Sequence, residues 1–290
     1  MNLEEYFQRI GFHGSFDSPD LTTLRWIHKQ HVMSIPFENF SIHCGERITL
    51  DLEIIFEKVV RSRRGGWCME NNFLFGWVLR EMGYDTTTLG STLFCTATGD
   101  FPGPETHLIN MVTIEGQAYL ADVSYGESSQ PWEPLELVSG KGQPQGPGVF
   151  RLTESGGVWV LEKTGRRLQV LNPDFAKSSL LNRRVTRPIY SFTLVPRDID
   201  HFYKANDDLQ IDPTSPLTNK SMCSLQTPTG FRALVGWTYS EVTYQPETGV
   251  DVYDMRDIPD GEMDSVLEEK FKIKLKNKLQ IVNRKVHFTL

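Results

Sequence analysis

The 290-residue sequence has no apolar run that approaches the roughly 20 residues of a membrane-spanning helix. Its first residues, Met1 to Tyr6, are acidic and amphipathic, so the start lacks the basic and then apolar pattern of a secretory leader. Acidic side chains outnumber basic ones by 37 to 30, and the net charge of −7 argues against a nucleic-acid partner. These absences predict a cytoplasmic protein without a membrane or nucleic-acid partner.

Cysteine is also scarce, with four residues that lack the close pair spacing of a disulfide framework or a zinc site. We therefore expect reduced thiols and no metal. Cys44, Cys95 and Cys223 fit a structural role, because a free cysteine usually packs as a small hydrophobic side chain. Cys68 stands in a different sequence context, which predicts a chemical role.

Cys68 ends the run Arg-Gly-Gly-Trp-Cys that starts at Arg64. Apolar residues then recur at helical spacing up to Met82, and Gly83 supplies a helix stop. Unpaired N–H groups and the dipole at a helix N-terminus stabilise a thiolate, so we expect the pKa of this thiol below about 8.5. The two glycines allow a sharp turn and a close approach of substrate to the sulfur. The alternative is a buried structural cysteine behind a flexible loop.

A histidine and an aspartate fall on one face of a predicted hairpin. Residues 107–114 and 117–123 alternate as strands do, and Glu-Gly between them fits a two-residue turn in which Gly116 takes positive φ. Counting back from this turn places His107 and Asp122 as diagonal neighbours about 7 Å apart at Cα, within reach of an imidazole–carboxylate hydrogen bond. A register shift of one residue would separate them, and the alternatives are an exposed strand histidine and a turn-forming aspartate.

The pattern of apolar residues along the sequence changes twice, which predicts an α+β fold in three sections. Residues 1–83 are helical and carry Cys68. Residues 84–190 read as short alternating strands of an antiparallel barrel and carry the histidine and the aspartate. Residues 191–290 mix strands with one late helix at about 261–272.

Turn and cap residues place further elements within these sections. Ser18-Pro19 and Asp51 read as helix starts. Segments 149–152 and 157–161 read as strands around a Glu-Ser-Gly-Gly turn. Glycine and proline dominate 139–148, so we expect a loop there, and without flanking strand and helix it is no phosphate-binding P-loop.

The chain resembles the arylamine N-acetyltransferases of animals over essentially its whole length. The motifs that carry this resemblance are Ile35–Asn39, Arg64–Cys68, Leu137–Lys141, Gln143–Gln145 and Cys223–Pro228. The resemblance implies a catalytic triad of Cys68, His107 and Asp122, in agreement with the hairpin register. It also implies a helical bundle, a β-barrel and an α/β lid on a cysteine-protease-like core.

The chemistry implied by the resemblance is acetyl transfer from acetyl-CoA to arylamines or hydrazines, in the metabolism of foreign compounds. We expect ping-pong kinetics through acetyl-Cys68, with His107 removing the surplus proton of the amine. O-acetylation of N-hydroxyarylamines belongs to the same implied chemistry. Backbone N–H groups at the helix start, including that of Cys68, are expected to stabilise the oxyanion. We expect a monomer.

Binding residues are also implied by the resemblance. Together with His107, the implied acceptor positions are Phe37, Thr106, Tyr125, Glu127 and Ser129. The implied coenzyme A positions are Gly103, Pro104, Thr214 and His287. Three of these depart from the family pattern, since Glu127 stands where some mammalian members have a basic residue, Pro104 has no N–H, and His287 replaces a small polar residue. The glutamate predicts a bias against acceptors that bear a carboxylate.

Two other classes of protein fit parts of the pattern. A cysteine hydrolase or transglutaminase-like enzyme would use the same three residues, but the short signature around papain-type cysteines is absent. A silent binding protein for aromatic ligands would have no use for an activated thiol. Resistance to iodoacetamide at neutral pH would favour the binding protein.

Overall fold

Helices form the first layer of the molecule. The computed structural model describes residues 1–14 and 18–282. The helices of this layer are α1 (Leu3–Ile10), α2 (Leu21–Ser34), α3 (Phe40–His43), α4 (Leu52–Phe56), which continues as a π-helical turn (Glu57–Arg61), and α5 (Cys68–Glu81). Helix α2 begins after Asp20, whose Oδ1 accepts the Thr23 N–H at 2.7 Å, so the predicted start at Ser18-Pro19 is wrong by two residues.

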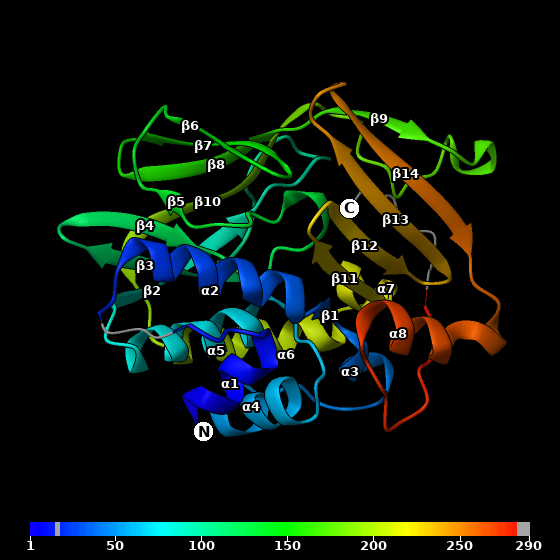
Figure 1. The fold of residues 1–290 in the computed structure, drawn as a ribbon, viewed down its shortest axis with the longest axis horizontal. Helices are drawn as coiled ribbons and strands as arrows, with labels where there is room; N and C mark the ends of the chain where they lie inside the picture. The colour runs from blue at the N-terminus through cyan, green and yellow to red at the C-terminus, as the bar shows by residue number, and fades with distance from the viewer. Residues whose placement is uncertain (15–17, 283–290) are drawn as a thin grey trace.

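An eight-stranded sheet forms the second layer and curls over helices α2 and α5 (Figure 1). Its order is β5-β4-β3-β2-β10-β8-β7-β6, and all its pairings are antiparallel. The strands are β2 (Asp85–Leu93), β3 (His107–Ile114), β4 (Gln117–Ala121), β5 (Leu135–Glu136), β6 (Gly142–Gln145), β7 (Gly148–Ser155), β8 (Val158–Thr164) and β10 (Thr186–Pro196). The nearly closed sheet confirms the expected antiparallel barrel and α+β class.

The β3–β4 hairpin has the predicted register. Ile114 pairs with Gln117, and the pairing continues to Asn110 and Ala121. Gly116 has φ 80° and Glu115 has φ 50°, so both turn residues are left-handed, as a two-residue hairpin of type I′ requires. The chain beyond Ala121 leaves the ladder, which frees the residues that follow it for the site.

The predicted loop at 139–148 contains a strand, β6, which pairs with β7. Side-chain amides rather than backbone groups join this strand to the other edge of the sheet. Gln143 accepts the Glu136 N–H at 2.8 Å and donates to the Glu136 carbonyl at 3.0 Å, while Gln145 accepts the Trp132 N–H at 2.7 Å. Composition predicted a loop because glycine and proline are poor strand formers, whereas these two glutamines fix an extended segment.

A second sheet, of six strands, lies beside the barrel (Figure 1). Its order is β1-β11-β12-β13-β14-β9, antiparallel except for the parallel pair of β14 and β9. The strands are β1 (Phe37–Glu38), β9 (Arg167–Val170), β11 (Met222–Thr227), β12 (Gly230–Val235), β13 (Thr238–Gln245) and β14 (Val250–Asp257). This sheet contains strands from all three predicted sections, and β10 crosses the predicted boundary at residue 190. The division of the chain into three domains therefore stays a prediction.

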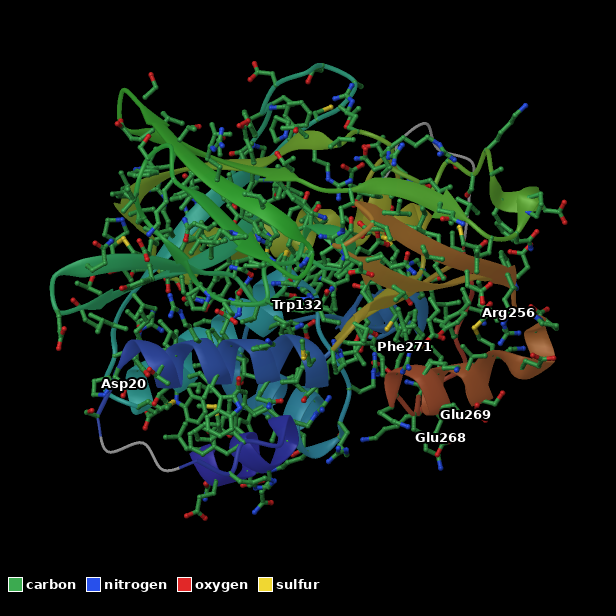
Figure 2. All side chains as sticks on the ribbon, turned by 45° about the horizontal axis from the view of Figure 1, so that its top comes forward. Asp20, Trp132, Arg256, Glu268, Glu269 and Phe271 are labelled. Atoms are coloured by element: carbon green, nitrogen blue, oxygen red, sulfur yellow. The ribbon has the colours of Figure 1, made fainter. Side chains whose placement is uncertain are left out.

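Three further helices follow β10 in the chain. They are α6 (Asp200–Ile211), α7 (Pro216–Asn219) and α8 (Met263–Phe271). Helix α8 confirms the late helix, with Phe271 fully buried toward the sheet while Glu268 and Glu269 point away from it (Figure 2). Short 3-10 turns occur at Glu127–Ser129, Pro173–Phe175 and Asp260–Glu262. Among the described residues, no helix is long and apolar enough to cross a membrane.

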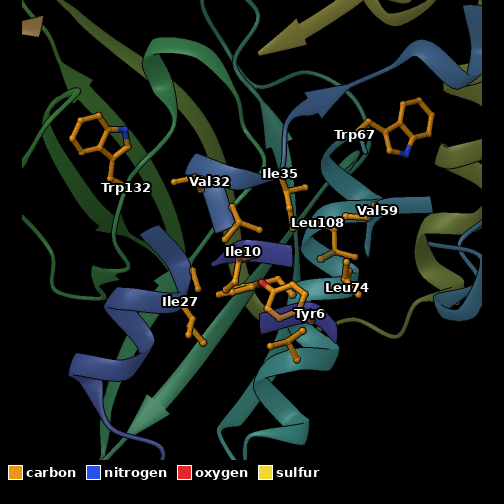
Figure 3. Close-up of a cluster of buried hydrophobic side chains, with 14 of the residues drawn as sticks. Tyr6, Ile10, Ile27, Val32, Ile35, Val59, Trp67, Leu74, Leu108 and Trp132 are labelled. Atoms are coloured by element: carbon orange, nitrogen blue, oxygen red, sulfur yellow. The ribbon is translucent and has the colours of Figure 1, made fainter. Parts of the chain in front are cut away.

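The largest hydrophobic core lies between the helical layer and the barrel. Leu74 of α5, Tyr6 of α1 and Ile27 of α2 are fully buried there against Leu108 of β3 (Figure 3). Full burial of side chains of this size contributes about 1.5–3 kcal/mol each. This packing fixes α5, which begins with Cys68, against the strand that begins with His107.

Candidate active site

Cys68 is the first residue of α5, as predicted, and is partly buried. Trp67 before it is extended, and its N–H donates to Glu70 Oε2 at 3.1 Å. Glu70 in turn holds Lys58 Nζ with both oxygens at 2.9 Å. This buried carboxylate fixes the turn that presents the sulfur, because it satisfies an N–H at the helix start.

The two glycines before Cys68 are required by packing rather than by a turn. Neither appears among the positive-φ glycines, and a Cβ at Gly65 would lie 2.2 Å from the Pro36 carbonyl oxygen. Gly66 donates to that carbonyl at 3.2 Å and accepts the Glu38 N–H at 3.0 Å. The glycines therefore let the chain lie directly against β1 without a left-handed backbone, and the close approach of substrate to the sulfur stays a prediction.

His107 and Asp122 form the expected pair at the end of the hairpin. The imidazole Nε2 lies 2.8 Å from Asp122 Oδ2, and the two residues are 2 % and 1 % exposed. The Cys68 Sγ lies 3.9 Å from the Thr106 carbonyl oxygen, directly before the histidine. Because Nε2 faces Asp122, Nδ1 is the nitrogen that remains for the interaction with Cys68.

Asp122 is held by more partners than the histidine. Its Oδ1 accepts from Asn72 Nδ2 at 2.9 Å and from the Ser124 N–H at 3.0 Å. Asn72 is itself fixed, because it also donates to the Leu108 carbonyl and accepts the Val123 N–H. Burial alone would raise the pKa of the Asp122 carboxyl, but the charge of His107 and these hydrogen bonds lower it.

The protonation of His107 follows from the same contacts. Burial favours the neutral ring, yet the Asp122 carboxylate and the Cys68 sulfur raise the pKa of His107 to about 10. Aromatic rings fix the imidazole plane, with Tyr125 edge-on at 5.6 Å and Tyr190 tilted at 5.3 Å between centroids. The site therefore holds an imidazolium beside a sulfur at neutral pH.

Two of the implied acceptor residues, Thr106 and Tyr125, adjoin this histidine. Tyr125 contacts its ring, Thr106 directly precedes it, and a Cβ on Gly126 would lie 3.5 Å from Phe37 Cγ. Ser129 is buried and its Oγ accepts from Arg187. Burial raises the pKa of the Glu127 carboxyl to about 7, against the charges of Arg187 and Lys220. The contact of these positions with an acceptor stays a prediction.

The implied coenzyme A residues are less constrained. Gly103, Pro104 and Thr214 are exposed, and His287 lies outside the described residues. A Cβ on Gly103 would meet open space, although its φ of 95° favours glycine. Thr214 donates from both its N–H and its Oγ1 to Asp212 Oδ1, each at 2.8 Å. These side chains leave room for a ligand, and their role stays a prediction.

Sequence reasoning missed the side chains that support the pair. Asn72 follows Cys68 by one helical turn, and a polar pair, Asn71-Asn72, inside an apolar helix was a signal for it. Lys163 and Arg187 hold the segment after Asp122 by donating to Ser128. Lys163 and Arg187 each belong to a strand with ordinary alternation of polar and apolar residues, so the sequence does not reveal that they support the site.

A buried histidine–carboxylate pair beside a cysteine at a helix N-terminus is the arrangement of acyl-transfer enzymes with a thiol nucleophile. A family model described as N-acetyltransferase matches residues 20–280. The arylamine N-acetyltransferase pineal gland isozyme NAT-10 of Gallus gallus is 47% identical over 290 residues, covering 100% of both chains. Arylamine N-acetyltransferase 2 of Mus musculus is 44% identical over 279 residues, covering 96% of each. The chain belongs to the arylamine N-acetyltransferase family.

Solved structures agree with this assignment. The arylamine N-acetyltransferase of Mycobacterium smegmatis superposes with a TM-score of 0.82 at 26% identity, covering 97% of this chain and 96% of that one. The Mycobacterium marinum enzyme in complex with CoA gives 0.78 at 26% identity, covering 94% and 93%. The helical layer with its barrel-like sheet and second sheet is therefore the fold of this family.

Proposed function

We propose that this enzyme transfers the acetyl group of acetyl-CoA to the nitrogen of arylamines and hydrazines, and to the oxygen of N-hydroxyarylamines, in the metabolism of foreign compounds. The observation that carries the mechanism is the imidazolium of His107, held by Asp122 and facing the Cys68 sulfur. Membership of the family supports the reaction, and the geometry of His107 and Asp122 beside Cys68 supports the assignment of the catalytic residues. Cys68 is the nucleophile, His107 the acid and base, and Asp122 the group that orients and charges the imidazole.

The first half-reaction acetylates the enzyme. The Cys68 thiolate, stabilised by the adjacent imidazolium and the start of α5, attacks the thioester carbonyl carbon. Backbone N–H groups at the helix start, including that of Cys68, stabilise the oxyanion. The carbon–sulfur bond to coenzyme A then breaks, and His107 gives its proton to the departing thiolate. Thiolate replaces thiolate, so the acetyl-cysteine keeps the reactivity of the donor.

The second half-reaction releases the product. The amine nitrogen attacks the carbonyl carbon of acetyl-Cys68, and neutral His107 takes the surplus proton as the amide bond forms. The Cys68 thiolate leaves and the resting imidazolium is restored. Phe37 and Tyr125 exclude water and stack on the aryl ring. Coenzyme A leaves before the amine enters, so the kinetics are ping-pong.

Donor binding falls to the implied coenzyme A positions. Gly103 and Pro104 stand on the segment that leads to His107, and Thr214 stands on the segment before α7. Their exposure leaves them accessible to a large cosubstrate. We infer that the enzyme works as a monomer in the cytoplasm, where its four free thiols stay reduced.

Acceptor choice follows from Glu127. A carboxylate at this position repels p-aminobenzoate and tolerates neutral or cationic amines. Because the pKa of Glu127 is about 7, this repulsion grows as the pH rises through neutrality. The ratio of kcat/KM for p-aminobenzoate to that for an uncharged arylamine should fall between pH 6 and pH 8, and Glu127→Gln should abolish that fall. Equal turnover of the two amines at pH 8 would contradict the assignment.

Intact mass measurement tests the function directly. Incubation with acetyl-CoA alone should add one acetyl group, and an arylamine should then remove it and yield acetylated amine. Cys68→Ala should give no adduct. Cys95→Ala is the matched control, since hydrogen bonds from Thr98 lower the pKa of the Cys95 thiol, and this variant should behave as the parent. No adduct in folded parent protein would favour the hydrolase.

A further inference from the structure

The segment Tyr125–Gln130, which carries three of the proposed acceptor positions, is held by side-chain hydrogen bonds. Gln130 Oε1 accepts the Tyr125 N–H at 2.8 Å and the Gly126 N–H at 3.1 Å. Arg187 donates to the hydroxyl of Ser128 at 2.7 Å. The shape of this segment is therefore set by its own Gln130 and by Arg187, which is distant in sequence.

Glu127 is the strained residue of the segment. Its φ of 47° lies in the left-handed region, which a residue with a Cβ rarely occupies. Its N–H donates to Ser224 Oγ at 3.1 Å, and its carbonyl accepts from Gln226 Nε2 at 2.8 Å. Such a conformation persists only when the surroundings determine it, and here the backbone N–H and carbonyl of Glu127 are both bound by side chains of one strand, β11.

Ser224 and Gln226 are placed to hold this conformation. They are 4 % and 3 % exposed, so water does not replace them easily. Gln226 Oε1 accepts from Trp132 Nε1 at 2.9 Å, which fixes its amide with the N–H₂ toward Glu127. Ser224 also pairs with Phe37 across β1 and β11. One strand therefore positions two of the proposed acceptor residues.

We propose that Ser224 and Gln226 are positioning residues for acceptor choice, because they hold Glu127 in the backbone conformation that shapes the acceptor side of the site. The second sheet, and not only the barrel, then decides which amine is accepted. This inference rests on the proposed function. Its effect belongs to the second half-reaction, since neither side chain contacts Cys68, His107 or Asp122 among the described hydrogen bonds.

The test separates the two half-reactions in Ser224→Ala and Gln226→Met. The rate of acetyl-Cys68 formation by acetyl-CoA, followed by intact mass, should stay within about twofold of the parent. The kcat/KM ratio between p-aminobenzoate and an uncharged arylamine should change about fivefold, the size expected for one lost hydrogen bond. Thr243→Ala, at an exposed position of β13 in the same sheet, is the control and should change neither quantity.

A second test compares the effect of Ser224→Ala in the parent with its effect in Glu127→Gly. Glycine occupies left-handed φ without strain, so Ser224→Ala should change the acceptor ratio in the parent but by less than twofold in Glu127→Gly. Normal acetylation with an unchanged acceptor ratio in both single variants would overturn the inference. A parallel fall of both half-reactions would also overturn it, because it would show a merely structural role. Absence of acetyl-Cys68 in the parent would instead refute the proposed function.

Discussion

The barrel and the helical layer each bury histidine almost completely, yet they hold it in opposite protonation states. His107 of the barrel faces a carboxylate, and its pKa rises to about 10. His28 of α2 donates from its Nδ1 to the Trp132 carbonyl at 2.9 Å, and burial lowers its pKa to about 4. Burial lowers the pKa of His31 well below its ordinary range as well. Burial by itself lowers the pKa of a histidine, and at His107 the paired Asp122, together with the Cys68 sulfur, reverses this effect.

The two regions therefore respond to pH with opposite sign. The raised pKa of His107 contributes stability that is complete below about pH 6.5 and is lost as the pH rises toward 10. The lowered pKa of His28 contributes stability that is complete above about pH 6.5 and is lost as the pH falls toward 4. The charged histidine serves the proposed chemistry, whereas the neutral ones limit stability in acid.

The largest effect is expected from removal of the Asp122 charge, which should abolish the difference in pKa between His107 and His28. In Asp122→Asn, His107 loses the partner that outweighs burial, so its pKa should fall below 6.5, as that of His28 does. Acetyl transfer should fall about 10³–10⁴-fold, by analogy with other triads whose aspartate is replaced by asparagine. Titration of the ring by NMR and the rate of acetyl-Cys68 formation measure the two effects. A His107 pKa that stays near 10 would contradict this account.

A smaller effect is expected in the helical layer, where His28 should make the free energy of unfolding depend on pH in acid. A difference of about 2.5 pKa units at His28 corresponds to about 3 kcal/mol of unfolding free energy lost between pH 6.5 and pH 4. His28→Leu should remove this part of the pH dependence, measured by urea unfolding across that range. His13→Leu, at an exposed position, is the control and should leave the pH dependence unchanged. An equal slope in parent and His28→Leu would show that this ring does not govern acid stability.

The smallest effect is expected at the partner of His31. Tyr6 Oη lies 2.7 Å from His31 Nδ1, and Tyr6→Phe removes that hydrogen bond without opening a cavity. The free energy of unfolding at pH 7 should fall by about 1 kcal/mol. Acetyl transfer should be unchanged, because neither residue contacts the site. Loss of activity with unchanged stability would link the helical layer to the chemistry.

Local patterns predicted the hairpin and the helix but not how they meet. Gly116 and strand alternation were enough to pair His107 with Asp122, because both signals act over a few residues. Cys68 was placed on its helix by apolar spacing. Its approach to Thr106 depends on packing between α5 and β3, which spacing does not encode, and there only the family resemblance brought the three residues together.

The residues that sequence reasoning missed share one property, since their environment is set by distant segments. His28 stands between Ile27 and Lys29 on α2, so its local sequence does not show that its ring is buried against the Trp132 carbonyl. Lys163 is 3 % exposed and donates to Ser128, 35 positions away. Burial lowers the pKa of this lysine well below its ordinary range. Strand alternation cannot distinguish such a residue from a solvated one.

The glutamine contacts between β6 and β5 bear on the tendency of the protein to aggregate at high concentration. An open sheet offers two edges of unpaired N–H and C=O groups, and such edges template aggregation between molecules. Gln143 occupies both backbone groups of Glu136, and Gln145 occupies the N–H groups of Trp132 and Glu133 and the Glu133 carbonyl. Two side-chain amides thus shield the seam of the barrel from self-association, without requiring the backbone to close it.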